Sequence, residues 1–236
     1  MRILVVFRGE NKRWNNGSWH DVRMCIPNNK VRIINSLRSK GYIVDIIFCT
    51  YDSEYLNSYV DSYNPLHVYK MPYEGSSQHI NFNFVLDSCS KHYNMYNKII
   101  ILRFDLLFKK NISEWPMWDK AGIMFPWKDH TLEAYNQRKY CQEVIISIDT
   151  QYFKEFKTLY QNEYTRWKDI TWGLHFLTTI LDKHALIPFF FMEGDIAYES
   201  NTHVPKNDHT AHAKKNPYLI NAIYDYVLDD RYLVDV

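Results

Sequence analysis

Residues 98–110 have the sequence KIIILRFDLLFKK, and this segment sets the architecture that we expect for the chain. Four apolar residues precede Arg103, Phe104 and Asp105, and apolar residues resume directly afterwards. An uninterrupted β-branched run of this kind is typical of a strand buried on both faces, as at the centre of an α/β sheet. The run is too short to span a membrane as a helix.

Arg103 and Asp105 lie at the carboxyl end of this predicted strand. Burying a charged side chain costs free energy unless the charge is paired or binds a ligand. Ligands bind outside the carboxyl ends of strands in open α/β sheets, so the two residues indicate a binding site. The alternative is an internal Arg103–Asp105 ion pair, although side chains two residues apart in an extended chain point the same way without necessarily touching.

The first fifty residues follow a strand–helix–strand pattern. Residues 3–7 and 44–49 are short apolar runs, and residues 31–40 have apolar positions at helical spacing before the stop signal Gly41. This pattern predicts a βαβ unit with parallel strands and a right-handed crossover. The polar segment 11–29, rich in Asn and Trp, is a candidate functional loop.

The rest of the chain continues to alternate between predicted strands and helices. No internal repeat or low-complexity linker is visible, so we expect one domain over residues 1–236. Residues 194–236 are predicted to form a C-terminal loop and helix that close the site. The remaining predicted elements are helices at 52–63, 82–93, 152–164, 171–181 and 217–228, and strands at 66–71, 121–125, 143–148 and 185–192.

Composition excludes several classes of protein. The chain has 28 basic and 27 acidic residues, a balance that argues against a general nucleic-acid binder. Aromatic residues make up 17% of the chain, which suits a packed core and leaves rings for stacking on sugars or bases. The four cysteines form no C-x-x-C pair, and the N-terminal apolar run is too short for a signal peptide. We therefore expect a cytoplasmic protein with no membrane span.

The sequence lacks the glycine-rich motifs of dinucleotide and P-loop sites, and it has no G-x-S-x-G nucleophile motif. The strand ends supply an alternative, because the carboxyl ends of parallel strands meet at one edge of a sheet. There a carboxylate could accept hydrogen bonds from a base or ribose, Asp105 could hold a divalent cation and Arg103 could contact phosphate oxygens. The converging segments are Arg8-Gly9-Glu10, Thr50-Tyr51-Asp52 and Arg103-Phe104-Asp105.

Four stretches of the chain resemble a group of viral, bacterial and plant glycosyltransferase-like proteins that have the GT-A fold. ILRFDLLFKKNI is similar to their R-x-D-L-x-F segment, which stands where other members have Asp-x-Asp. VVFRGENKR and VDIIFCTYD resemble the first two strands of the group, and QEVIISIDTQYFKEF resembles a segment beside the acceptor cleft. The resemblance covers residues 1 to about 159. It implies an α/β fold with a single GT-A-like (Rossmann-like), mostly parallel central sheet flanked by helices.

The resemblance also implies a donor site and a metal. A nucleoside-diphosphate sugar, with UDP-sugars favoured, would be the donor, and Mn²⁺ or Mg²⁺ would be the cofactor. Arg103 replaces the usual first aspartate, so a guanidinium could take over part of the charge stabilisation that a metal provides. The residues that the resemblance assigns to donor binding are Arg8, Gly9, Arg13, Thr50, Asp52, Arg103 and Asp105.

The same resemblance implies metal ligands. Asp105 would bind the metal, and His203, His209 or His212 from the C-terminal region would complete the coordination shell, with His209 favoured; the alternative is that these histidines are solvated. Glu143, Asp149 and Asp169 are candidates for a carboxylate base, of which Glu143 and Asp169 are expected to face the acceptor hydroxyl. The alternatives are a solvated strand-start residue for Glu143 and a carboxylate favoured by a helix N-terminus for Asp169.

The sequence therefore predicts a hexosyl- or pentosyltransferase that moves a sugar to a hydroxyl of a glycan or glycoprotein. A second hypothesis is a non-catalytic nucleotide-sugar or glycan-binding module, which the missing first aspartate favours. Neither hypothesis involves nucleic acid as a partner.

Overall fold

Seven strands form a central mixed sheet in the computed structural model, which describes residues 1–15, 18–75, 77–115, 118–126, 141, 143–167, 174, 176–183, 188–190 and 219–221. Four strand pairs are parallel: β1 with β4, β1 with β6, β4 with β5, and β8 with β10. β9 is antiparallel to both of its neighbours, β6 and β8. The sheet is thus mostly parallel, as predicted. Its order is β10 (Pro188–Phe190), β8 (Ile123–Phe125), β9 (Ile145–Asp149), β6 (Lys98–Arg103), β1 (Arg2–Gly9), β4 (Ile43–Tyr51) and β5 (His67–Met71).

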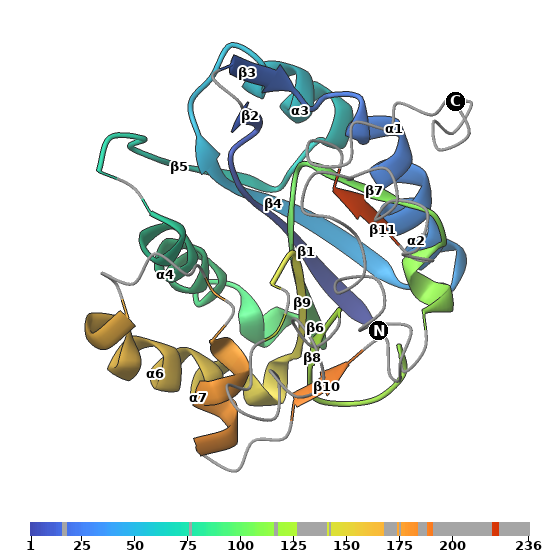
Figure 1. Ribbon diagram of the computed structural model, residues 1–236. Helices are drawn as coiled ribbons and strands as arrows, with labels where there is room; N and C mark the ends of the chain where they lie inside the picture. Colours follow the sequence, from blue (N-terminus) through green and yellow to red (C-terminus); the bar gives the residue numbers. More distant parts are fainter. Residues whose placement is uncertain are drawn as a thin grey trace, which may run out of the picture.

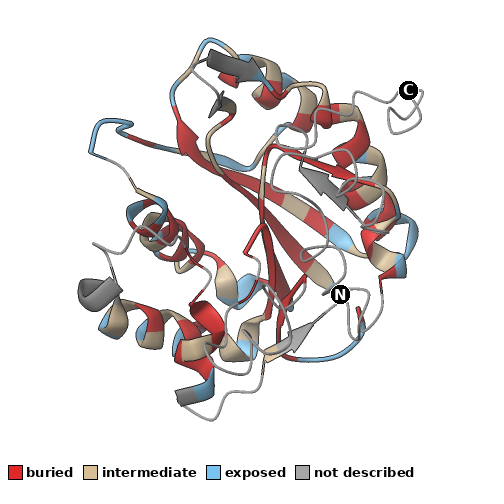
Figure 2. Ribbon diagram, in the orientation of Figure 1, coloured by how far each residue is buried: buried red, intermediate tan, exposed pale blue. Residues whose placement is uncertain are grey.

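The predicted buried strand is β6, which lies beside β1 at the middle of the sheet. Both strands consist of β-branched and other large apolar residues that are buried almost throughout, because helices cover both faces (Figure 2). Arg8 is opposite Arg103 in the β1–β6 pairing, and Gly9 is opposite Thr50 in the β1–β4 pairing. The predicted strand ends therefore lie side by side.

The sheet has helices on both faces (Figure 1). Alternate residues of β1 enter two separate cores: Ile3, Val5 and Phe7 belong to one and Leu4 and Val6 to the other. The first core is covered by α1 (Cys25–Asn29), the π-helical η1 (Lys30–Asn35), α2 (Ser36–Ser39) and α3 (Leu56–Tyr63). The second is covered by α4 (Gln78–Cys89), α6 (Thr150–Trp167) and α7 (Leu177–Lys183).

Two short antiparallel pairs lie outside the central sheet. β2 (Lys12–Asn15) and β3 (Ser18–Asp21) pair antiparallel, so the segment predicted as a loop at 11–29 contains two paired strands and all of α1. β7 (Leu106–Phe108) pairs with β11 (Leu219–Asn221). The helix predicted at 217–228 is therefore wrong at 219–221, where the backbone pairs with β7 as a strand instead. The rest of 194–236 lies outside the described residues.

Several helices start elsewhere than predicted, among them the first helical segment and α4. The first helical segment begins at Cys25 instead of residue 31, and α4 begins at Gln78 instead of residue 82. The side chain of Ser77 accepts a hydrogen bond from the Ile80 N–H, which caps α4 ahead of its apolar residues. Single-turn 3₁₀ helices occur at η2 (Tyr93–Met95) and η3 (Ile112–Glu114). Within the described ranges, no helix has the length and apolar character needed to cross a bilayer.

Candidate functional site

The strand order creates a topological switch point between β1 and β6. From β1 the chain builds outward through β4 and β5, and it then returns to place β6 on the other side of β1. The connections on the two sides of a switch point leave in opposite directions, which opens a crevice outside the carboxyl ends of the two strands. The sheet therefore predicts a ligand site beside Gly9 and Arg103, where β1 and β6 end.

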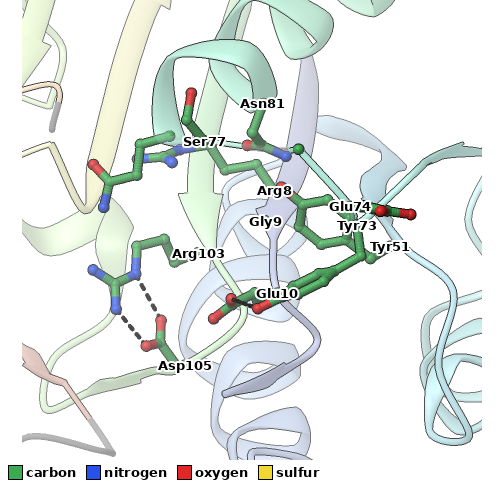
Figure 3. Close-up of a pocket in the computed structure, with 12 residues that line it drawn as sticks. Arg8, Gly9, Glu10, Tyr51, Tyr73, Glu74, Ser77, Asn81, Arg103 and Asp105 are labelled. Carbon is green, nitrogen blue, oxygen red and sulfur yellow. Dashed lines mark hydrogen bonds and ion pairs between the residues drawn. The ribbon is translucent and has the colours of Figure 1, made fainter. Parts of the chain in front are cut away.

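A cavity of about 540 Å³ lies at this position (Figure 3). Its walls come from the ends of β1 and β6, from the end of β4, and from the segment that joins β5 to α4. It combines two guanidinium groups with three carboxylates and two tyrosine rings. The lining residues are Arg8, Gly9, Glu10, Tyr51, Tyr73, Glu74, Gly75, Ser77, Gln78, Asn81, Arg103 and Asp105.

Arg103 and Asp105 form an ion pair on one side of the cavity (Figure 3). Arg103 Nε donates to Asp105 Oδ1 at 2.8 Å, and Nη2 contacts Oδ2. The internal pair, which the sequence left as the alternative, is thus present, and both residues also line the cavity. Asp105 is 2% exposed, and both of its carboxylate oxygens contact one guanidinium.

Arg8 is a buried cation at the inner wall of the cavity, with 3% of its surface exposed. Nη2 donates to the Glu143 carbonyl oxygen at 2.9 Å, and the Glu143 carboxylate is 3.7 Å away. The guanidinium carbon lies 5.7 Å from the centre of the Phe82 ring. Burial lowers the pKa of Arg8; the Glu143 carboxylate opposes this shift, and Arg103 adds to it.

The end of β1 is shaped by a glycine and a threonine. Gly9 has φ +85°, a left-handed conformation that side chains disfavour, and it turns the chain out of the strand. Thr50 Oγ1 donates to the Gly9 carbonyl oxygen at 2.6 Å. Thr50 is fully buried, so it supports the wall of the cavity from behind and does not line it.

A second cavity of about 240 Å³ adjoins the first, and the two share Glu10, Tyr51 and Tyr73 in their walls. The Tyr73 hydroxyl donates to Glu10 Oε1 at 3.1 Å, and the Tyr51 and Tyr73 rings meet edge to face with centroids 5.1 Å apart. The smaller cavity is also lined by Asp52, whose exposed carboxylate is 3.0 Å from Lys70 Nζ. It therefore offers aromatic rings and carboxylates side by side.

The amino end of α4 forms another part of the larger cavity wall. Ser77 is the N-cap, Gln78 begins the helix, and Asn81 follows within the first turns. No acidic residue occupies the first turn of α4. The Asn81 amide donates to the Met71 sulfur at 3.1 Å, whereas its buried oxygen has no hydrogen-bond partner among the residues that the structure describes.

The structure brings together most of the residues predicted for donor binding that it describes. Asp52 lines the smaller cavity, and Glu143 lies behind Arg8, 3% exposed. Arg13 is part of β2, but its side chain lies outside the described residues, as do Asp169, His203 and His209. No three His, Cys, Asp or Glu side chains gather as a metal-binding group among the described residues. Arg8, Gly9, Arg103 and Asp105 line the larger cavity.

Sequence reasoning missed the contribution of the segment that joins β5 to α4. Tyr73, Glu74, Ser77, Gln78 and Asn81 all line the larger cavity. The strand at β5 was predicted, and the segment after a parallel strand reaches the same sheet edge as its neighbours. Ser77 was also a possible helix cap, so both signals were present.

Fold and site together define an open α/β protein with a polar cavity at its switch point. The cavity suits a small ligand that carries negative charge, hydroxyl groups and a flat ring, because guanidinium groups, carboxylates and tyrosines line it together.

Comparison with known proteins adds little beyond this class. No protein-family model matches the chain, and no curated protein matches it. Among solved structures, the chain is similar to a glycosyltransferase involved in the glycosylation of the major capsid of PBCV-1, with a TM-score of 0.46 and 7% sequence identity. The similarity covers 94% of this chain and 92% of that chain. At this TM-score the likeness carries no inference about activity.

Proposed function

We propose that the protein is a glycosyltransferase that moves a sugar from a nucleoside-diphosphate donor, with UDP-sugars favoured, to a hydroxyl of a glycan or glycoprotein. The observation that carries this proposal is the cavity at the β1–β6 switch point, which holds Arg8, Arg103 and Asp105. The resemblance of the same strand ends to GT-A sequences supports it independently of the geometry.

The chemistry of a nucleotide sugar matches the groups that line the two cavities. Its diphosphate needs cationic donors, and Arg8 and Arg103 supply guanidinium groups at neighbouring strand ends. Its base needs a flat apolar surface and its ribose needs hydrogen-bond acceptors. Tyr51, Tyr73 and Asp52 supply these around the smaller cavity. Thr50 has an indirect role, because its hydroxyl donates a hydrogen bond to the Gly9 carbonyl oxygen.

Transfer requires the acceptor oxygen to attack the anomeric carbon while the bond from that carbon to the diphosphate breaks. The nucleoside diphosphate leaves with the bonding electron pair, and the acceptor proton goes to a base or to the leaving group. Arg8 and Arg103 would stabilise the charge that develops on the leaving diphosphate. Of the two predicted bases, Glu143 is buried against Arg8, which favours a role in holding that guanidinium.

The divalent cation implied by the resemblance stays a prediction. Asp105 is its proposed ligand, but both Asp105 oxygens contact Arg103. The described residues supply no cluster of three His, Cys, Asp or Glu side chains, so they do not fit a closed metal site. A bound cation would supply charge neutralisation at the diphosphate. The cytoplasmic location likewise stays a prediction.

A non-catalytic nucleotide-sugar or glycan-binding module is the second candidate. One observation favours it: Asp105, the carboxylate expected to bind the metal, is engaged by Arg103 instead. Such a module would bind the donor and release no nucleoside diphosphate from it. Turnover therefore distinguishes the two candidates, whereas binding alone does not.

A thermal-shift screen against UDP-, GDP- and CDP-sugars, each with and without Mn²⁺, tests the proposal. A ligand at 100 times its dissociation constant stabilises a protein by about 2.7 kcal/mol. For a domain of this size, the midpoint should rise by roughly 5 to 10 °C. A shift with one nucleotide family, followed by release of that nucleoside diphosphate, is the expected result. The absence of a shift with every donor would contradict the proposal.

A further inference from the structure

The amino end of α4 and the side chain of Arg8 face the same part of the larger cavity. Phe82, four residues into α4, lies against the Arg8 guanidinium, so the helix and the arginine are packed together. The first backbone N–H groups of an α-helix point outward at its positive end. Because the first turn of α4 contains no acidic residue, its own side chains do not neutralise that end.

Arg8 is only partly compensated within the protein. Among the described residues, one of its five N–H donors is in a hydrogen bond, from Nη2 to a backbone carbonyl, and Nε has no hydrogen-bond partner there. The Glu143 carboxylate at 3.7 Å is beyond hydrogen-bond distance, and within the described part of the chain its Oε2 also has no hydrogen-bond partner. Because a buried guanidinium with few hydrogen bonds is unfavourable, an anion that accepts hydrogen bonds from it would bind with a gain in free energy.

Asn81 adds a second polar group with an incomplete set of partners. Its amide donates to the sulfur of Met71, which is a weak acceptor that a phosphate oxygen could replace. Two of the three cavity carboxylates are engaged elsewhere: Asp105 is held by Arg103, and Glu10 accepts the Tyr73 hydroxyl (Figure 3). The third, Glu74, belongs to the segment before the N-cap Ser77 and is not part of the first turn of α4.

We propose that the amino end of α4, Arg8 and Asn81 form an oxyanion subsite of the phosphate class that binds without a divalent cation. Given the proposed function, on which this step rests, its occupant is the diphosphate of the donor. The positive end of the helix and the Arg8 guanidinium then balance the negative charge of the diphosphate, and Asp105 acts as the partner that positions Arg103.

Calorimetric titration of the full chain in EDTA tests the subsite, with sodium pyrophosphate, UDP and uridine as separate probes. Pyrophosphate and UDP should bind and uridine should bind more weakly. Gln78→Glu places a carboxylate in the first turn of α4, where it favours the helix but repels an anion. We expect this variant to weaken the binding of pyrophosphate at least about tenfold, or about 1.4 kcal/mol. Arg8→Gln should weaken it further.

Gln151→Glu is the matched control, because Gln151 is an exposed residue in the first turn of α6 and does not line the cavity. It should leave pyrophosphate affinity within about twofold. Gln78→Glu should fold as well as the parent, so this variant decides the case even where Arg8→Gln fails to fold.

The outcomes separate this inference from the proposed function. Nucleotide binding that requires Mn²⁺, or that is unchanged by Gln78→Glu, would overturn the subsite and leave the transferase proposal standing. Pyrophosphate binding that Gln78→Glu weakens, together with no binding of any nucleotide sugar, would support the subsite and contradict the transferase. No binding of pyrophosphate or UDP under any condition would overturn both.

Discussion

Asp105→Asn distinguishes an ion-pair partner from a metal ligand. If Asp105 were a metal ligand, loss of its carboxylate would abolish turnover with little loss of stability. The structure predicts a different result, because Asp105 is 2% exposed and holds Arg103 through both of its oxygens. Removing one charge of a buried ion pair costs about 3 to 5 kcal/mol.

We expect a cost near the lower end, because the Arg103 side chain is 11% exposed and faces the cavity. About 3 kcal/mol corresponds to a fall in the melting temperature of roughly 6 to 12 °C for a chain of this size. Differential scanning calorimetry measures this directly. The double variant Arg103→Gln/Asp105→Asn should recover part of the loss in melting temperature, since neither charge of the pair then remains. A melting temperature for Asp105→Asn within about 2 °C of the parent would refute the reasoning.

Three further predictions follow from the described residues. Gly9→Ala should lower the free energy of unfolding, measured in urea, by about 1 to 2 kcal/mol, because φ at Gly9 is +85°. No atom of the described residues lies within 4 Å of the added methyl group, so the cost comes from the backbone conformation. Gly9→Asn should cost less, and an equal cost for both variants would contradict a backbone origin. Burial, then His67 and Lys91, lowers the pKa of His92, so the stability that its neutral form provides is lost as pH falls below about 6.5. His92→Gln should flatten the fall in melting temperature from pH 7.5 to 5, and an unchanged slope would count against this. Burial raises the pKa of the Cys49 thiol to about 12, and Cys25, Cys89 and Cys141 are buried as well. A thiol reagent at pH 8 should therefore label the folded protein far more slowly than the unfolded chain.

The sequence was sufficient to predict the central strands and the meeting of their ends. β1 and β6 contain continuous apolar runs and β4 is apolar over most of its length, interrupted at Asp45; such strands have few alternatives to a sheet buried on both faces. Parallel pairing then placed Arg8, Gly9 and Arg103 together without any knowledge of their side-chain contacts. These parts of the site depend on topology, which hydrophobic patterning specifies well.

Side-chain pairing and helix starts were not predictable from patterning. The contact of Arg103 with Asp105 depends on a turn at Phe104, which spacing along an extended strand does not represent. The polar first turn of α4 interrupts the apolar period, so the helix was placed too late and Gln78 was missed. β11 was assigned to a helix because a strand of three residues, only two of them apolar, gives no period of its own.

Hydrogen–deuterium exchange with and without saturating UDP, GDP and CDP tests the central claim most directly, because it reports where a nucleotide binds. The account predicts that one nucleotide slows exchange in segments 8–12, 51–53, 73–81 and 103–105, which surround the two cavities. Exchange on the far strand end, at residues 41–44 and 96–98, should stay unchanged. Protection confined to other segments, or no protection with any nucleotide, would contradict a nucleotide site at the β1–β6 switch point.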